Sequence, residues 1–273
     1  MMEPIASLQN ARVKHVVKLR DRKGRERQGR IVVDGLREIR LALSHGVQIV
    51  EVFCCEALCV SDEARQLRRD LEIAGIVPVL TTASVWDKLT FGNRRDGLLA
   101  VAVPPSTGLS EIRDRDLGHA PPFLVILDAI EKPGYVGAVC RTADGAGVSA
   151  VILTEPLSDP FNPNTIRASL GAVFRRPPVV VSRAELWSYL RQENIHVFAA
   201  HVDAQQTYND VDYATGCALV LGSEARGLGP EWIEQGATPI SLPMRGAVDS
   251  LNVSNAAAIL MYEVVRQREG ASR

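Results

Sequence analysis

The sequence lacks any apolar run of about 18 residues, the length that a membrane-spanning helix needs. Its opening stretch, MMEPIASLQNARVKH, also lacks the apolar segment of a signal peptide. The five cysteines contain no C-x-x-C pair, the spacing that a structural metal site normally uses. We therefore expect a cytoplasmic protein with reduced thiols, no membrane association and no metal.

Two nucleotide-binding signatures are absent as well. G-x-x-x-x-G-K-[ST], which cradles phosphates in P-loop proteins, occurs nowhere, and no predicted strand is followed directly by G-x-G-x-x-G. The hypothesis that the chain is a nucleotide-dependent oxidoreductase therefore rests on the α/β pattern alone, because the glycine motif of such enzymes is absent. The formal net charge of −1 excludes no class of partner until the distribution of charge is considered.

What is present is an ordinary globular composition, with 46% hydrophobic and 23% charged residues among 273. In the first half, apolar runs alternate with amphipathic stretches, which predicts an α/β domain. Its expected strands are 30–35, 47–54, 76–80 and 97–103, and its expected helices are 36–46, 62–75 and 82–91. A polar stretch punctuated by proline and glycine follows. The predicted domains are residues 1–104 and 122–273, joined by a linker over 105–121.

The second half predicts a parallel sheet, because strands such as ALVLG are apolar throughout and suit burial on both faces. Strands are expected at 123–128, 149–154, 178–182, 196–201, 218–222 and 238–242, and helices at 136–147, 163–171, 184–194, 229–236 and 253–268. Ligands of parallel sheets bind beyond the carboxyl ends of the strands. Three candidate motifs stand at such ends.

Each motif also has a purely structural interpretation. PGYVG places Gly134 and Gly137 where backbone can approach a ligand, yet an ordinary turn uses glycine in the same way. Glu224, on the tip of LGSEARGLG, either accepts hydrogen bonds from a ligand or starts a helix. Asn252 and Ser254 could be helix caps. The helix that follows them is apolar on nearly every side, which indicates burial in its own core or against a partner subunit.

Positive charge gathers in residues 12–30, which hold nine Arg or Lys against two acidic residues. Such a stretch is either a solvated face or an arm that binds a phosphate backbone without sequence preference. The candidate RNA-binding residues of this basic arm are Lys14, Lys18, Arg20, Arg22, Lys23 and Arg25.

Together the three motifs resemble the SpoU/TrmH family of RNA ribose 2′-O-methyltransferases, within the SPOUT superfamily. The resemblance rests on P-G-x-x-G-x-x-x-R-T-A at 133–143, L-G-S-E-x-x-G at 221–227, and I-S-L-P-M with S-L-N-V-S at 240–254. The first half of the chain resembles the family's substrate-binding domain. The resemblance implies a C-terminal α/β domain with a trefoil knot, which sequence periodicity alone could not indicate.

The resemblance also implies a cofactor and an assembly. S-adenosyl-L-methionine (AdoMet) lies in the knot, and the family works as a homodimer in which residues of the partner complete each active site. No metal is needed. The cofactor-binding positions in this sequence would be Gly222, Ser223, Leu242, Met244 and Leu251.

By position, Arg141 is the family's catalytic arginine. A guanidinium is a poor base, so we favour Arg141 as a group that orients the ribose 2′-hydroxyl and stabilises developing negative charge. A deprotonated Arg141 acting as the base is the alternative mechanism. Glu224 would position Arg141 or the acceptor nucleotide, and Ser250 and Asn252 would hydrogen-bond the RNA backbone and the arginine.

One position departs from the family pattern: Tyr135 stands where the family usually has asparagine. A tyrosine ring can stack on a base, but it cannot reproduce the short amide. The chain is therefore either an active enzyme with a modified acceptor site or a weakened one that persists as an RNA-binding or ribosome-assembly protein. We favour an active methyltransferase acting on ribosomal RNA, with transfer RNA as the alternative substrate and a role in antibiotic resistance left open.

Overall fold

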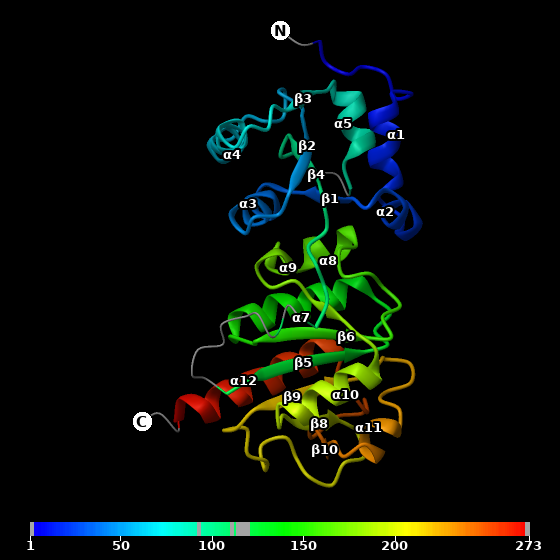
Figure 1. Cartoon of the computed structure of the whole chain (residues 1–273), viewed down its shortest axis with the longest axis vertical. Coiled ribbons are helices and arrows are strands. Elements are labelled where there is room, and N and C mark those ends of the chain that lie inside the picture. Colours follow the sequence, from blue (N-terminus) through cyan, green and yellow to red (C-terminus); the bar gives the residue numbers. More distant parts are fainter. Residues whose placement is uncertain (1–2, 92–93, 110–111, 113–120, 271–273) are drawn as a thin grey trace. The chain divides into compact units, whose positions relative to one another are not determined.

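The computed structural model describes residues 3–91, 94–109, 112 and 121–270. The predicted linker over 105–121 lies mostly outside these residues. The chain forms two compact units (Figure 1). Unit 1 contains residues 1–105 and 159–175, and unit 2 contains residues 106–158 and 176–273.

Unit 1 is built on a four-stranded mixed sheet of order β1-β4-β2-β3. β4 is antiparallel to β1 and β2, whereas β3 is parallel to β2. The strands are β1 (Ile31–Asp34), β2 (Ile49–Cys54), β3 (Val79–Leu80) and β4 (Leu98–Ala102), and the helices are α1 (Ala11–Lys18), α2 (Arg22–Gln28), α3 (Leu36–Ser44), α4 (Asp62–Ile73), α5 (Ala83–Leu89), α8 (Pro163–Ala168) and α9 (Ala172–Arg175).

The predicted basic arm is part of the folded core of unit 1. Its residues form α1 and α2, which begin after side-chain caps from Asn10 and Asp21. Val13, Val16 and Leu19 recur every three residues, so α1 buries one apolar face in the same cluster as Trp86. The charged residues lie on the remaining faces.

Unit 1 also takes in a segment from the second half of the sequence. Residues 159–175 belong to the predicted domain 122–273 but lie in unit 1. They form α8, which packs on β1, and α9, which packs on α3. Asp159 pairs with the buried Arg25 guanidinium. At Gly171 an added Cβ would lie 3.1 Å from Glu38 Cα, so only glycine allows this close approach.

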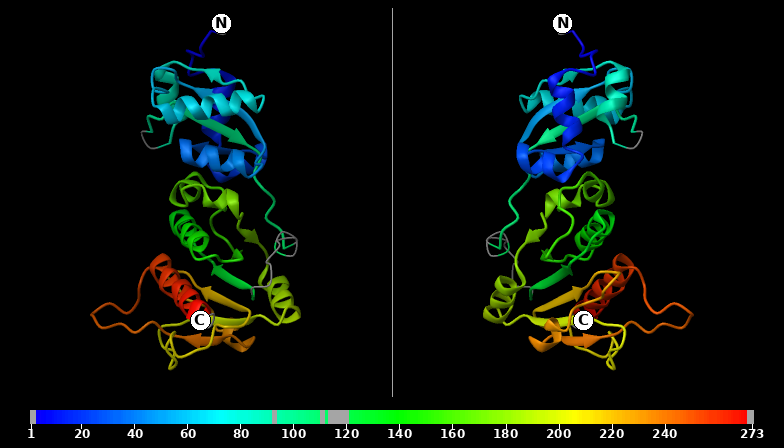
Figure 2. Two further views of the ribbon diagram at one scale, coloured as in Figure 1. Left: turned by 90° about the vertical axis from the view of Figure 1, so that its left-hand side faces the viewer. Right: turned by 90° about the vertical axis from the view of Figure 1, so that its right-hand side faces the viewer.

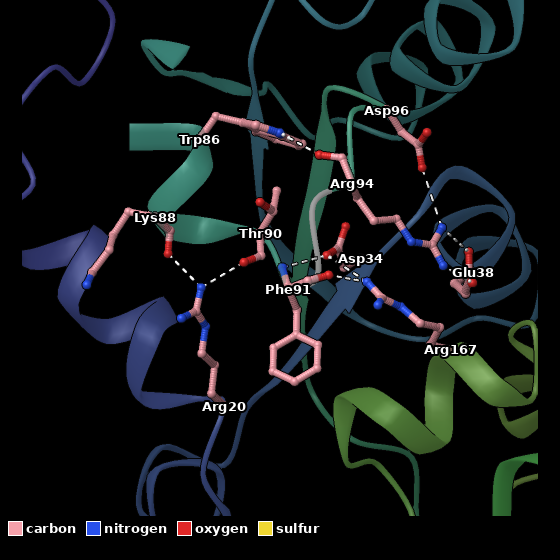
Figure 3. Close-up of polar contacts among 10 residues, drawn as sticks. All are labelled: Arg20, Asp34, Glu38, Trp86, Lys88, Thr90, Phe91, Arg94, Asp96 and Arg167. Atoms are coloured by element: carbon pink, nitrogen blue, oxygen red, sulfur yellow. Dashed lines mark hydrogen bonds and ion pairs between the residues drawn. The ribbon is translucent and has the colours of Figure 1, made fainter. Parts of the chain in front are cut away.

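A polar cluster joins this segment to the end of β1 (Figure 3). The Phe91 amide donates to Asp34 Oδ2 at 2.9 Å, and Arg167 donates to the Phe91 carbonyl while its guanidinium lies 3.8 Å from Asp34 Oδ2. Glu38, also buried, accepts from Arg94 at 2.8 Å. Asp34 Oδ1 has no hydrogen-bond partner within the described part of the chain. Burial raises the pKa of Asp34 despite its partners.

We expect Asp34→Asn to change how the stability of unit 1 depends on pH. Because the folded pKa of Asp34 is raised, its favourable contribution is complete below the ordinary carboxyl value of 3.8 and is lost as pH rises through the folded value. The free energy of unfolding of the variant, relative to that of the wild type, should therefore rise from acidic to neutral pH. Urea unfolding at several pH values measures this, with the exposed Asp62→Asn as control. A constant difference between variant and wild type would contradict it.

Unit 2 contains a six-stranded sheet of order β10-β8-β9-β5-β6-β7, in which every pair is parallel. This confirms the predicted α/β fold with a parallel sheet. All six predicted strands are present, with ends within two residues of the expected positions. They are β5 (Phe123–Asp128), β6 (Ala150–Thr154), β7 (Val179–Val180), β8 (His196–Ala200), β9 (Cys217–Leu221) and β10 (Thr238–Ile240).

Helices cover both faces of this sheet, as buried apolar strands require. Figure 2 shows α7 (Pro133–Gly145) and α12 (Val253–Gly270) on one side and α10 (Arg183–Gln192) on the other. The short α11 (Glu231–Glu234) brings Trp232 into the same apolar cluster as α10. The sequence placed the start of α7 at 136, but the helix begins at Pro133, because proline suits the first helical position. PGYVG is thus the first turn of a helix.

Asp128, at the carboxyl end of β5, is the most connected buried charge of unit 2. Arg183 binds it with two hydrogen bonds of 2.8 and 2.9 Å. Thr154 donates to it from β6 at 2.7 Å, and the Trp232 indole donates at 3.2 Å. The carboxylate is 2% exposed, so these donors replace water almost completely.

We expect Asp128→Ala to lower the free energy of unfolding of unit 2 by about 3 kcal/mol, because it leaves an indole N–H, a hydroxyl and two nitrogens of the Arg183 guanidinium without their acceptor, although Arg183 keeps its ion pair with Glu231. The exposed Glu131→Ala should change it by less than about 0.5 kcal/mol. Urea unfolding followed by tryptophan fluorescence compares the two. Equal losses would mean that the network adds little to stability.

Candidate active site

The main cavity of unit 2 opens at the carboxyl ends of β8, β9 and β10, where a parallel sheet binds its ligands. Its volume is about 400 Å³. Residues from three loops and the start of α12 line it: Ala200, His201, Val202, Asp203, Leu221, Gly222, Ser223, Glu224, Arg226, Gly227, Leu228, Ile240, Leu242, Met244, Asp249, Ser250, Leu251, Val253 and Ala256. Motifs distant in sequence therefore meet in one place, because their strands are neighbours in the sheet.

The five predicted cofactor residues all line this cavity: Gly222, Ser223, Leu242, Met244 and Leu251. The loop that carries the first two is tightly folded. The Gly227 amide donates to the Ser223 carbonyl at 2.8 Å, and Ser223 Oγ accepts from the Arg226 amide. A Cβ at Gly222 would lie 2.2 Å from the Gly227 carbonyl oxygen, so the loop can close only over glycine.

The chemistry of this lining suits AdoMet. Leu221, Ile240 and Leu251 give apolar walls for a flat heterocycle, and Asp203 and Glu224 offer carboxylates to a cationic ligand. Nothing in the lining requires a metal, and the described residues contain no cluster of three metal-ligating side chains. Nor does any helix in the described part of the chain have the length and apolarity to cross a membrane.

A second cavity, of about 210 Å³, adjoins the first, and Glu224 and Val253 line both. Lys132 and Tyr135, from the start of α7, line only the smaller one. Lys132 Nζ donates to Glu224 Oε2 at 2.8 Å and lies 5.0 Å from the centre of the Tyr135 ring. The hydrogen bond from Lys132 lowers the pKa of Glu224, and the carboxylate in turn raises the pKa of Lys132.

The other predicted catalytic residues lie apart from this cluster. Arg141 is exposed on α7, and its side chain makes no hydrogen bond or ion pair with another residue of the described chain. Ser250 lines the main cavity and donates to Asp249 at 3.2 Å. Asn252 lines neither cavity, and its side chain accepts from the Asn255 amide at 2.9 Å, as a cap of α12 does. A single chain thus does not bring Arg141 to Glu224.

The basic residues of α1 and α2 divide into two groups. Arg25 is 6% exposed and donates to the carbonyls of Leu19 and Arg20 as well as to Asp159, so it holds the fold together. Arg20 likewise donates to the carbonyls of Lys88 and Thr90.

The second group is available to a ligand. Arg22 is exposed and pairs only with Glu26. Lys14, Lys18 and Lys23 are exposed, with no ion pair to another residue of the described chain. The sequence could not separate these residues from Arg20 and Arg25, because spacing does not tell a buried guanidinium from a solvated one.

Lys132 and Asp203 are the site residues that the sequence did not single out. Lys132 directly precedes the proline of the first motif. Its position just before the first turn of α7 was the one signal in the sequence that could have placed it at the site. Asp203 follows β8, whose carboxyl end lies beside that of β9 in the sheet. Strand order, which is not visible in one sequence, decides that this loop reaches the cavity.

Comparison with protein families matches nearly the whole chain. Residues 122–262 match the SpoU rRNA Methylase family, and residues 10–100 match an MRM3-like substrate binding domain. A 23S rRNA (guanosine(2553)-2′-O)-methyltransferase, RlmP of Bacillus subtilis, is 29% identical over 96% of this chain and 99% of its own length. RlmB of Salmonella typhi, a 23S rRNA (guanosine-2′-O-)-methyltransferase, is 35% identical over 72% of this chain and 82% of its own.

Solved structures agree. The SpoU methyltransferase AviRb of Streptomyces viridochromogenes, crystallised with AdoMet, superposes with a TM-score of 0.86 at 28% identity over 96% of this chain and 99% of its own. An RNA 2′-O ribose methyltransferase superposes with a TM-score of 0.82 at 33% identity, over 98% of this chain and 100% of that one. These likenesses span both units.

If the exposed lysines of α1 and α2 contact an RNA backbone, neutralising them should weaken binding in a salt-dependent way. The variant carries Lys14→Gln, Lys18→Gln and Lys23→Gln together. We expect the negative slope of log affinity against log salt concentration to become less steep by about two to three. Filter binding to ribosomal RNA at several salt concentrations measures it. Deleting residues 1–30 is unsuitable, because it would remove Val13 and Val16 from the core.

The matched control neutralises three arginines of α4: Arg65→Gln, Arg68→Gln and Arg69→Gln. Its salt slope should remain that of the wild type. Equal slopes for the lysine variant and the wild type would assign the three lysines to an ordinary solvated face.

Proposed function

The chain belongs to the SpoU rRNA methylase family, and from this premise we propose that it transfers a methyl group from AdoMet to a ribose 2′-hydroxyl of ribosomal RNA. The observation that carries the proposal is the main cavity, where motifs far apart in sequence supply five cofactor positions together with Glu224 and Ser250. The trefoil knot implied by the resemblance follows from the family's fold.

AdoMet supplies a methyl group on a positively charged sulfur, already a good leaving group. The protein must therefore align the two substrates and assist the loss of the hydroxyl proton. Leu242 and Leu251 would give the cofactor apolar contacts in the main cavity, and Glu224 lines both this cavity and the smaller one. Arg141 orients the 2′-oxygen and stabilises its developing charge, since a guanidinium keeps its proton at neutral pH.

We further propose that the enzyme is a homodimer in which Arg141 serves the site of the other protomer. Support comes from its exposed position and from the neighbouring surface of α12. Ile259 and Tyr262 remain 39% and 52% exposed on this helix, one turn apart. Tyr262 lies beside Gly145 of α7, so the two helices present one partly apolar face.

Ribosomal RNA is the preferred substrate because the MRM3-like domain match and the exposed lysines of α1 and α2 extend the protein well beyond the catalytic unit. Transfer RNA is the alternative. A second candidate function, RNA binding without catalysis, is favoured by one observation: Tyr135 replaces the family's usual asparagine beside Glu224.

The decisive experiment transfers a radiolabelled methyl group from AdoMet to rRNA and tRNA from cells that lack this protein. We expect label in one rRNA, at a single linkage that resists alkaline cleavage, and at least about a hundredfold slower labelling by Arg141→Ala. Its control is Arg191→Ala, which removes an exposed arginine of α10 that lines neither cavity. This control should label RNA at the rate of the wild type. RNA binding without AdoMet binding or label would leave the non-catalytic function.

A further inference from the structure

None of the five predicted cofactor residues lines the smaller cavity, yet charged and aromatic side chains do. At about 210 Å³ it has roughly half the volume of the main cavity, which suits a single heterocycle. Its polar lining comes from Lys132, Tyr135 and Glu224, with Glu131 at the edge, and its apolar lining comes from Ile130, Ala225 and Val253. Because Glu224 and Val253 line both cavities, a base in the smaller one leaves its ribose at their junction.

Lys132 and Glu224 present two opposite hydrogen-bonding groups side by side. An ammonium only donates and an ionised carboxylate only accepts, and here the two atoms are 2.8 Å apart. A base that binds to both groups needs a hydrogen-bond acceptor for Lys132 next to hydrogen-bond donors for Glu224. Guanine offers O6 beside the N1–H and the 2-amino group, so it satisfies the ammonium and gives two hydrogens to the carboxylate. Adenine, cytosine and uracil each offer the carboxylate one hydrogen from that edge.

Tyr135 completes the environment of a flat ligand. Its half-buried ring lines the cavity and has Lys132 Nζ 5.0 Å from its centre. Unstacked RNA bases are commonly held on aromatic side chains, which restore the stacking that the base loses when it leaves a helix. An asparagine at this position would leave the stacking face unfilled.

We propose that the smaller cavity holds the nucleobase of the acceptor nucleotide, and that Lys132 together with Glu224 selects guanine. The inference rests on the proposed methyl transfer and adds the base to it. Lys132 is thereby a specificity-determining residue of a site so far described only by its cofactor positions.

The first test maps the methylated nucleotide in rRNA from cells that lack the protein. The expected product is 2′-O-methylguanosine. A methyl group on any other nucleotide overturns the inference and leaves the proposed function intact. Absence of methyl transfer to every RNA overturns the proposed function itself.

The second test uses the shortest RNA around the mapped site that the wild type still methylates, made with guanosine, inosine or adenosine at that position. Inosine lacks the 2-amino group, so we expect kcat/KM to fall about tenfold for inosine and more for adenosine. Lys132→Met should reduce the preference for guanosine over adenosine at least about tenfold, whereas Lys132→Arg, which keeps a donor, should retain it. If Lys132→Met slows all three RNAs equally, Lys132 only positions Glu224 and the inference fails.

Discussion

The ion pair between the buried Asp128 and the half-buried Arg183 fixes the edge of the sheet at which the candidate active site lies. Asp128 ends β5, which lies between β9 and β6, and its four donors come from β6, α10 and α11. The next residue, Ala129, adopts φ +53°, a conformation that is costly for alanine, and its amide is held by Thr154. Three residues later the chain reaches Lys132 and starts α7. The position of the smaller cavity therefore depends on a carboxylate that does not touch it.

Unit 1 is built from two segments that are far apart in the sequence. Residues 159–175 leave unit 2 after β6, pack on β1 and α3, and return before β7. Arg25 and Asp34, both from the first 34 residues, find their ionic partners in this segment. The chain thus passes between the two units three times, at residues 105–106, 158–159 and 175–176.

The strands were predictable from the sequence, whereas the neighbours of many residues were not. Continuous apolar runs locate β5, β6 and β9 because a strand buried on both faces has no other composition. The cofactor positions Gly222, Leu242 and Leu251 came from the resemblance of the motifs to the family, and all three residues line the main cavity. Local spacing could not show that Arg25 is buried, that α8 belongs to unit 1, or that Lys132 reaches Glu224, since each depends on long-range packing. The predicted start of α7 at residue 136 was a local error. Residues 133–135 were taken for a loop, but they form the first turn of the helix.

Glu224 is the charged residue that the two cavities of unit 2 share, since it lines both of them. In the structure Lys132 compensates its charge, and the pair is only partly shielded from solvent. A cationic sulfur bound in the main cavity would add a second positive charge in a cavity that Glu224 lines, and a base bound in the smaller cavity would compete for the lone pairs of the same carboxylate. Each ligand therefore changes the field felt by the other. The family's asparagine is neutral and short, so replacing it with Tyr135 beside Lys132 exchanges an amide contact for a stacking surface and leaves recognition of the base edge to the Lys132–Glu224 pair.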